Sequence, residues 1–237
     1  MKLVWCPDTA SKAYIDGVRA IANDAASPAT DGSPELAELV AAMAGGWNAQ
    51  LIVDAPDTTP PSTSSSRRPP ATSLSLAAAA RRTGGRYARV DVSPEESDHS
   101  GSSSSATEAA MARLEAVDLL VLDARRRDAA AVLRAARPGP RGMVVVRHGD
   151  TTGGGVRRRA AASASATAPW GMMAAGTRVV RAAYLPIGAG GVEVLHVGVG
   201  KGPSLPTAQQ QSRRSGRGRW IRHVNHRTGE EHVFRRQ

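Results

Sequence analysis

The stretch that most constrains the fold is residues 117–124, Val-Asp-Leu-Leu-Val-Leu-Asp-Ala, a short apolar run with a carboxylate near each end. A helical-looking, alanine-rich segment follows at 129–136, then a Gly/Pro turn and a second apolar run at 143–146. Strand, helix, turn and strand within about thirty residues are the proportions of one βαβ unit. Apolar runs that do not alternate with polar residues are typical of parallel strands buried on both faces. The sequence therefore predicts the middle of an open, doubly wound α/β sheet.

Acidic residues follow the predicted strands at their carboxyl ends. Asp123 ends the first run, Asp54 ends a buried-type strand at 51–54, and Asp91 lies near the end of a strand predicted at 86–92. Ligands of open α/β sheets bind in the crevice outside the carboxyl ends of the strands. These three carboxylates are therefore the candidate site residues.

The C-terminal third has a different pattern. Residues 178–185 and 192–199 are joined by a Gly-rich turn too short for a crossover helix, which predicts an antiparallel hairpin. A second hairpin is predicted from 219–225 and 231–235. The predicted fold class is α/β, a Rossmann-like, mostly parallel sheet with an antiparallel C-terminal hairpin and helices on both faces. Further helices are expected at 8–22, 33–46, 73–82 and 107–116.

Composition predicts how the chain is organised. Hydrophobic residues make up 41% but aromatic residues only 3%, so the core should consist mainly of Val, Leu and Ala. Segments rich in Ser, Pro, Gly or Arg at about 56–72, 97–106 and 150–169 are predicted low-complexity inserts. The α/β domain is expected to span 1–200, and 201–237 to form a basic linker with the hairpin tail.

Charge is concentrated in that tail. From Lys201 onward the chain has nine basic and two acidic residues, which is +7 of the total of +10. Arginine and glycine with one aromatic, Trp220, are typical of segments that contact RNA, so nucleic acid is a candidate partner. The alternative is a solubilising end whose arginines stay in water.

Cysteine usage and hydropathy give the expected compartment. The single Cys6 cannot form an intrachain disulfide, which fits a reducing environment. No apolar run reaches the length of a membrane span, and the N-terminus has no signal-peptide pattern. We expect a cytoplasmic or nuclear protein that does not enter the membrane.

Several segments resemble known families. Residues 117–124, together with Asp128, are similar to the "fDfvflDadk" stretch of small-molecule O-methyltransferases of the caffeoyl-CoA type, and residues 185–188 to the "lPigdG" entry to their final strand. Over most of its length the chain more closely resembles a plant family of unknown function often labelled methyltransferase-like. That resemblance is carried by residues 1–5, 41–49, 219–221 and 229–235.

The resemblance implies an S-adenosylmethionine-dependent methyltransferase acting on a small-molecule acceptor. Methyl transfer is an in-line displacement, so such an enzyme mainly aligns two ligands and excludes water. By resemblance, Asp91 would accept hydrogen bonds from the cofactor ribose, Asp54 would lie beside the cofactor, and Asp123 would line the acceptor pocket. His148 could act as a general base, although a lone histidine with no evident orienting partner is more often a surface residue.

The chain departs from the active enzymes at two places. The turn after the first strand, residues 54–61, has three prolines and no glycine, which hinders close backbone approach and removes N–H donors. Either the cofactor binds differently or it does not bind. Arg147 and His148 stand where the caffeoyl-CoA type keeps further metal ligands, and an arginine repels a divalent cation. We therefore expect no metal ion.

Each candidate also has a purely structural interpretation. Asp91 would cap a helix starting near Pro94, and Asp123 would pair with the arginines at 125–127, which are expected to form a solvated helix entrance. For Asp54 the structural interpretation is preferred, and His148 is expected to be a surface residue.

Two hypotheses about function follow. The first is a divergent S-adenosylmethionine-dependent methyltransferase with an unidentified acceptor. The alternative is a catalytically inactive relative that keeps the fold as a binding scaffold, contacting nucleic acid through the Arg-rich tail.

Overall fold

The computed structural model describes residues 4–24, 34–57, 69–91, 102–149, 173–188, 190–202, 220–224 and 231–235. The helices in this part of the chain are α1 (Pro7–Asn23), α2 (Pro34–Gly46), α3 (Ala71–Thr83), α4 (Ser102–Ala112) and α5 (Ala129–Ala135). The strands are β1 (Leu51–Ala55), β2 (Arg86–Arg89), β3 (Leu119–Asp123), β4 (Met143–His148), β5 (Thr177–Leu185), β6 (Val192–Val199), β7 (Trp220–Val224) and β8 (Glu231–Arg235).

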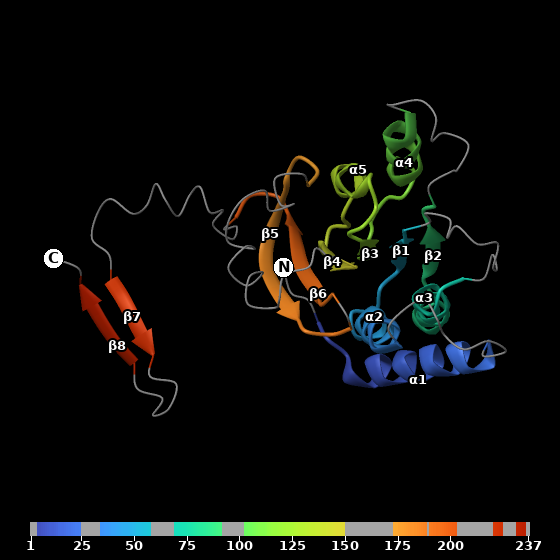
Figure 1. Ribbon diagram of the computed structural model, residues 1–237, viewed down its shortest axis with the longest axis horizontal. Helices are drawn as coiled ribbons and strands as arrows, with labels where there is room; N and C mark the ends of the chain where they lie inside the picture. Colours follow the sequence, from blue (N-terminus) through green and yellow to red (C-terminus); the bar gives the residue numbers. More distant parts are fainter. Residues whose placement is uncertain are drawn as a thin grey trace.

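The main sheet has six strands in the order β2-β1-β3-β4-β6-β5 (Figure 1). The first four strands in this order are mutually parallel, whereas β6 runs antiparallel to both β4 and β5. This arrangement confirms the predicted fold class, a Rossmann-like, mostly parallel α/β sheet that ends in an antiparallel hairpin.

Helices cover both faces of the sheet (Figure 1). Helices α1, α2 and α3 pack together on one face, and α4 packs with α5 on the other. In β3, Leu119 and Val121 belong to the core under α1–α3, while Leu120 and Leu122 belong to the core under α4 and α5. Burial on both faces explains why this strand is a continuous apolar run.

Several element boundaries differ from the predicted ones. Helix α4 begins at Ser102 and ends at Ala112, earlier than predicted at both ends. Strand β2 ends at Arg89, which leaves Asp91 two residues beyond it. Strand β4 continues through His148 because this residue still pairs with Asp123 of β3. Pairing with a neighbouring strand extends or shortens a strand. Because this pairing depends on the tertiary structure, the local sequence does not predict where a strand ends.

The N-terminal segment is fastened to the end of α2. The Cys6 N–H donates to the Gly46 carbonyl at 2.8 Å. Trp5 lies against Gly46, and its ring meets Trp47 edge-on with centroids 5.5 Å apart. Trp47 in turn meets His196 of β6 at 5.4 Å. Two segments that carry the family resemblance, near residues 5 and 46, therefore form a structural joint.

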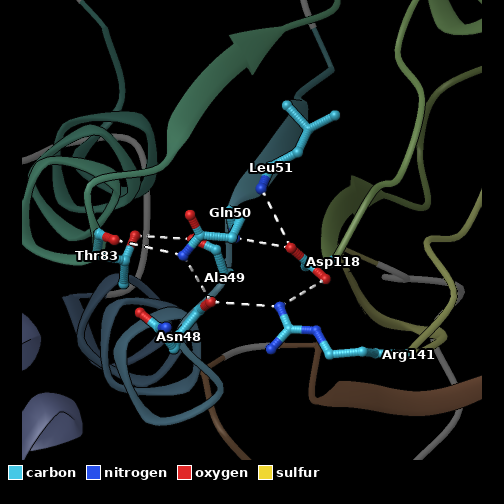
Figure 2. Close-up of polar contacts among 7 residues, drawn as sticks. All are labelled: Asn48, Ala49, Gln50, Leu51, Thr83, Asp118 and Arg141. Carbon is cyan, nitrogen blue, oxygen red and sulfur yellow. Dashed lines mark hydrogen bonds and ion pairs between the residues drawn. The ribbon is translucent and has the colours of Figure 1, made fainter.

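A polar network closes the amino-terminal edge of the sheet (Figure 2). One carboxylate oxygen of Asp118 accepts the backbone N–H groups of Gln50 and Leu51 at 2.7 and 3.3 Å. The other accepts from Arg141 at 3.1 Å. Thr83, at the end of α3, donates its hydroxyl to the Ala49 carbonyl at 2.7 Å. The network ties the start of β3 to the starts of β1 and β4.

Replacing Asp118 with alanine is expected to lower the free energy of unfolding by about 2 kcal/mol, because two backbone donors at the start of β1 lose a charged acceptor. Urea denaturation followed by circular dichroism measures the change. Arg141→Gln is the matched control. Its side chain is 51% exposed, so its ion pair with Asp118 is worth under about 1 kcal/mol. Equal losses in both variants would contradict the importance assigned to the backbone donors.

Strands β7 and β8 form a separate two-stranded antiparallel sheet, with Ile221 paired to Phe234. The second predicted hairpin is thus confirmed. Residues 203–219, which hold most of the predicted basic linker and the Arg-rich part of the tail, lie outside the described residues, as do most of the predicted inserts.

Candidate functional site at the carboxyl edge of the sheet

The sheet register brings polar side chains of four parallel strands to one face. Asp54 pairs with Arg89 and with Val121, which lies two residues before Asp123. Asp123 pairs with His148. Paired residues on neighbouring strands point to the same face, as do residues two apart on one strand. These side chains therefore share the face that α1–α3 cover. With their contacts they are called the carboxyl-edge cluster here: Asp54, Ser73, Tyr87, Arg89, Asp91, Asp123 and His148.

Asp54 is buried, with 2% exposure, and its carboxylate accepts hydrogen bonds from two side chains of the protein. The Ser73 hydroxyl, from the first turn of α3, donates to Oδ2 at 2.5 Å, and the Tyr87 hydroxyl donates to the same oxygen at 2.9 Å. Burial raises the pKa of Asp54 above its ordinary value, although the two hydroxyl donors and the nearby charges of Arg89 and His148 oppose that rise. Asp54 is a buried acid held by two hydroxyl groups.

Asp91 is the exposed carboxylate of the cluster. Its side chain is 50% exposed, and Oδ1 accepts a hydrogen bond from Arg89 Nε at 2.7 Å. Arg89 Nη1 also reaches Ser73 Oγ at 3.5 Å. Arg89 therefore connects the exposed acid to the buried one through Ser73. The helix expected near Pro94, which Asp91 would have capped, lies outside the described residues.

Asp123 is buried and neutralised by its own loop. Arg125 donates to it from the backbone at 2.9 Å and from the guanidinium at 2.6 Å. Burial opposes ionisation of Asp123, but the hydrogen bonds from Arg125 outweigh it, so the pKa is lowered. Gly149 (φ +80°) lies so close that a Cβ there would collide with Asp123 Oδ1. The pairing with Arg125 is the arrangement that the structural interpretation of Asp123 predicted.

His148 is half-buried rather than on the surface, which corrects the prediction. It ends β4, where pairing with Asp123 places it within the cluster. Burial lowers the pKa of His148, and Arg125 adds to that effect, while the carboxylates of Asp123 and Asp54 oppose it. The net lowering favours the neutral imidazole at neutral pH. The prediction failed because the sequence alone does not show that this histidine ends a strand and faces two acids.

Arg126 also contradicts its prediction as part of a solvated helix entrance. Its side chain has 0% exposure. Nη1 donates to the carbonyls of Pro56 and Val90, both at 2.7 Å, while Nε and Nη2 donate to the two oxygens of Asp128 at 2.9 and 2.8 Å. Thr107 of α4 donates to Asp128 Oδ2 at 2.6 Å. One guanidinium thus fastens together the loops after β1 and β2 and the start of α5.

A family model described as "Protein of unknown function (DUF1442)" matches residues 1–236. The chain belongs to the DUF1442 family. This agrees with the resemblance, noted in the sequence, to a family of unknown function. No curated protein matches this DUF1442 chain.

One solved structure resembles the DUF1442 chain at a distance. The crystal structure of cofactor-bound Rv0187 from MTB is 15% identical, covers 78% of this chain and 89% of its own, and has a TM-score of 0.39.

Within the described residues of the DUF1442 chain, no group of three or more His, Cys, Asp or Glu side chains is arranged to hold a metal ion. Similarly, no described helix is both long and apolar enough to cross a membrane.

The carboxyl-edge cluster of this DUF1442 chain can be compared with what S-adenosylmethionine, the cofactor that the sequence resemblance implies, would need. Asp91 offers an exposed carboxylate beyond β2, where an acid can accept hydrogen bonds from ribose hydroxyl groups. The loop after β1 offers no glycine, and its Pro56 carbonyl already accepts from Arg126. The residues present therefore suit a nucleoside held at its ribose, without the close backbone approach of a Gly-rich turn.

Proposed function

We propose that this DUF1442 protein is a divergent S-adenosylmethionine-dependent methyltransferase-like protein that holds the cofactor ribose through Asp91. The observation that carries the proposal is the half-exposed Asp91 carboxylate, oriented by Arg89 at the carboxyl edge of the sheet. Such edges are where open α/β sheets bind nucleotides. S-adenosylmethionine, when bound, supplies an activated methyl group.

The residues around Asp91 support binding by preorganisation. Arg89 holds Asp91 at 2.7 Å and is itself linked to Ser73 on α3. Arg126 fixes the loop after β2 to the loop after β1 through two carbonyls. A carboxylate that a neighbouring side chain already orients loses less conformational entropy when a ligand binds.

The acceptor would lie on the side of Asp123 and His148. Asp123 is neutralised by Arg125, so the neutral imidazole of His148 is the group there that can accept a proton from an acceptor hydroxyl. The acceptor itself is a small molecule whose identity the site does not specify.

Asp91→Ala is expected to weaken the binding of S-adenosylhomocysteine at least about tenfold, because two ribose hydroxyls lose a charged acceptor. Isothermal titration calorimetry of the wild type and the variant measures the change. Glu108→Ala is the matched control, since Glu108 is also an exposed acid paired to an arginine, but on α4. Unchanged affinity in Asp91→Ala would remove the ribose assignment.

A second candidate is favoured by a different observation. Asp54 and Asp123 are both satisfied by the protein's own donors, as expected of a relative that keeps the fold as a scaffold without the chemistry. Nucleic acid is the candidate partner of such a scaffold, because the last 37 residues carry a net charge of +7. The same titration separates the two, since no heat from the wild type at high concentration favours the scaffold.

A further inference from the structure

A second concave site lies away from the carboxyl edge. A pocket of about 390 Å³ opens between the C-terminal halves of α1 and α3. Helix α3 starts above the carboxyl edge with Ser73 and ends at the amino-terminal edge with Thr83. The pocket residues on its last turns are therefore at the other end of the sheet from the carboxyl-edge cluster.

Small residues create the hollow. Gly17 lets α1 approach α3 closely, since a Cβ there would meet Ser75 Cβ at 3.2 Å. One turn further along, Ala20 of α1 and Ala78 of α3 line the pocket. Their methyl groups are too short to fill the space between the two helices, and longer side chains surround it.

The longer side chains are mainly arginines. Arg19, Arg81 and Arg82 line the pocket together with the single carboxylate of Asp16. Arg82 is already paired, with Nε and Nη2 both 2.6 Å from Asp16 Oδ2. Among the described residues, Arg19 and Arg81 have neither a carboxylate nor a carbonyl partner. Three guanidinium groups and one carboxylate leave two positive charges facing one concavity.

This charge is not explained by the helix dipole alone. Arg81 and Arg82 lie in the last turn of α3, where cations are favourable. Arg19 lies before the last turn of α1, so it compensates no helix end. Like charges that line one hollow repel one another. An anion bound there relieves that repulsion.

We propose that this pocket binds a phosphorylated small molecule, with Arg19 and Arg81 on the phosphate and the Asp16–Arg82 pair as a fixed wall. Guanidinium groups match phosphate oxygens in pairs and stay charged at all physiological pH values. The pocket volume lies in the range of small-ligand sites. A strand of RNA is favoured less, because the charge lies in one hollow and does not form an extended stripe.

The probe is inorganic pyrophosphate, titrated calorimetrically into the full-length protein at low ionic strength. The double variant Arg19→Gln/Arg81→Gln is expected to bind about tenfold to a hundredfold more weakly than the wild type, because it loses two charge-assisted contacts. Both side chains are exposed, so the melting temperature should not change. Arg113→Gln/Arg127→Gln removes the same charge from exposed arginines elsewhere and should bind as the wild type does.

A change of opposite sign gives an independent check. Asp16→Asn removes the carboxylate and releases Arg82, so affinity should rise, whereas Asp8→Asn on the same helix should leave it unchanged. Three results would each overturn the proposal. They are no binding of pyrophosphate at millimolar concentration, an equal loss of pyrophosphate affinity in both double arginine variants, and a protein that binds RNA but not pyrophosphate. None of these results bears on Asp91, so this inference and the proposed function can fail separately.

Discussion

Replacing Arg126 with methionine is expected to lower the free energy of unfolding by about 3–5 kcal/mol, the usual cost of breaking a buried ion pair. The guanidinium has 0% exposure and satisfies the carbonyls of Pro56 and Val90 as well as the carboxylate of Asp128. Methionine fills the volume but leaves these acceptors buried, with Asp128 keeping only Thr107 as a side-chain donor among the described residues. Urea unfolding at pH 7 measures the loss.

The pH dependence of this loss has a definite sign. Burial opposes ionisation of Asp128, but the hydrogen bonds from Arg126 and Thr107 outweigh it and lower the pKa. A carboxyl with a folded-state pKa below its unfolded value contributes stability above the unfolded pKa, and that stability is lost as the pH falls through the folded-state pKa. The difference between wild type and Arg126→Met should therefore shrink in acid. Arg127→Met, next to it but exposed, should stay within about 0.5 kcal/mol.

Two results would contradict this account of Arg126. The first is a loss below about 1 kcal/mol at pH 7, which is the size expected of an exposed pair. The second is full stability in Arg126→Lys, which keeps the charge but cannot reach both carbonyls and the carboxylate with one planar fork.

The second large effect concerns Gly45, where α1 crosses the end of α2. Gly45→Ala is expected to destabilise the protein by about 1–3 kcal/mol, the usual cost of overpacking. A Cβ at this position would collide with Ala13 and lie 2.6 Å from the Thr9 carbonyl oxygen, so the backbone of α1 must move. Alanine normally stabilises a helix relative to glycine by about 1 kcal/mol, so the sign of the result is decisive.

Gly46→Ala is the matched control for this packing argument. There the added Cβ would meet the ring of Trp5, a side chain that is 45% exposed and can rotate away. We expect a smaller loss than at Gly45. Differential scanning calorimetry measures both, and for a chain of this size Gly45→Ala should lower Tm by about 3–9 °C. A Gly45→Ala protein as stable as the wild type would show that α1 packs differently.

Local signals were sufficient for most of the fold. The apolar run at 117–124 became β3 in the centre of the sheet, and the Gly-rich turn before Val192 joined an antiparallel pair. Buried parallel strands and hairpin turns impose patterns on neighbouring residues, so they can be read from one sequence. Boundaries that depend on pairing, such as the end of β4 at His148, could not.

The candidate site was predictable only in part. Strand-end position placed Asp54, Asp91 and Asp123 at the carboxyl edge, because that follows from chain direction. Their partners come from elsewhere in the chain: Ser73 is 19 residues from Asp54, and the Pro56 carbonyl is 70 residues from Arg126. From sequence alone, a run of three arginines is predicted to lie in solvent. Only the tertiary fold places the carbonyls of distant residues against the middle one, Arg126.

The position of β6 has a consequence for how the chain is made. This strand is inserted between β4 and β5, although it leaves the ribosome after both. Until Val192–Val199 has been synthesised, one side of β4 has no native hydrogen-bonding neighbour, and such a side recruits other strands. The nascent protein therefore passes through a stage in which this unpaired side of β4 can form hydrogen bonds with strands of other chains. A slow stretch of translation before codon 192 would prolong that stage, and a holdase chaperone would have its greatest effect there.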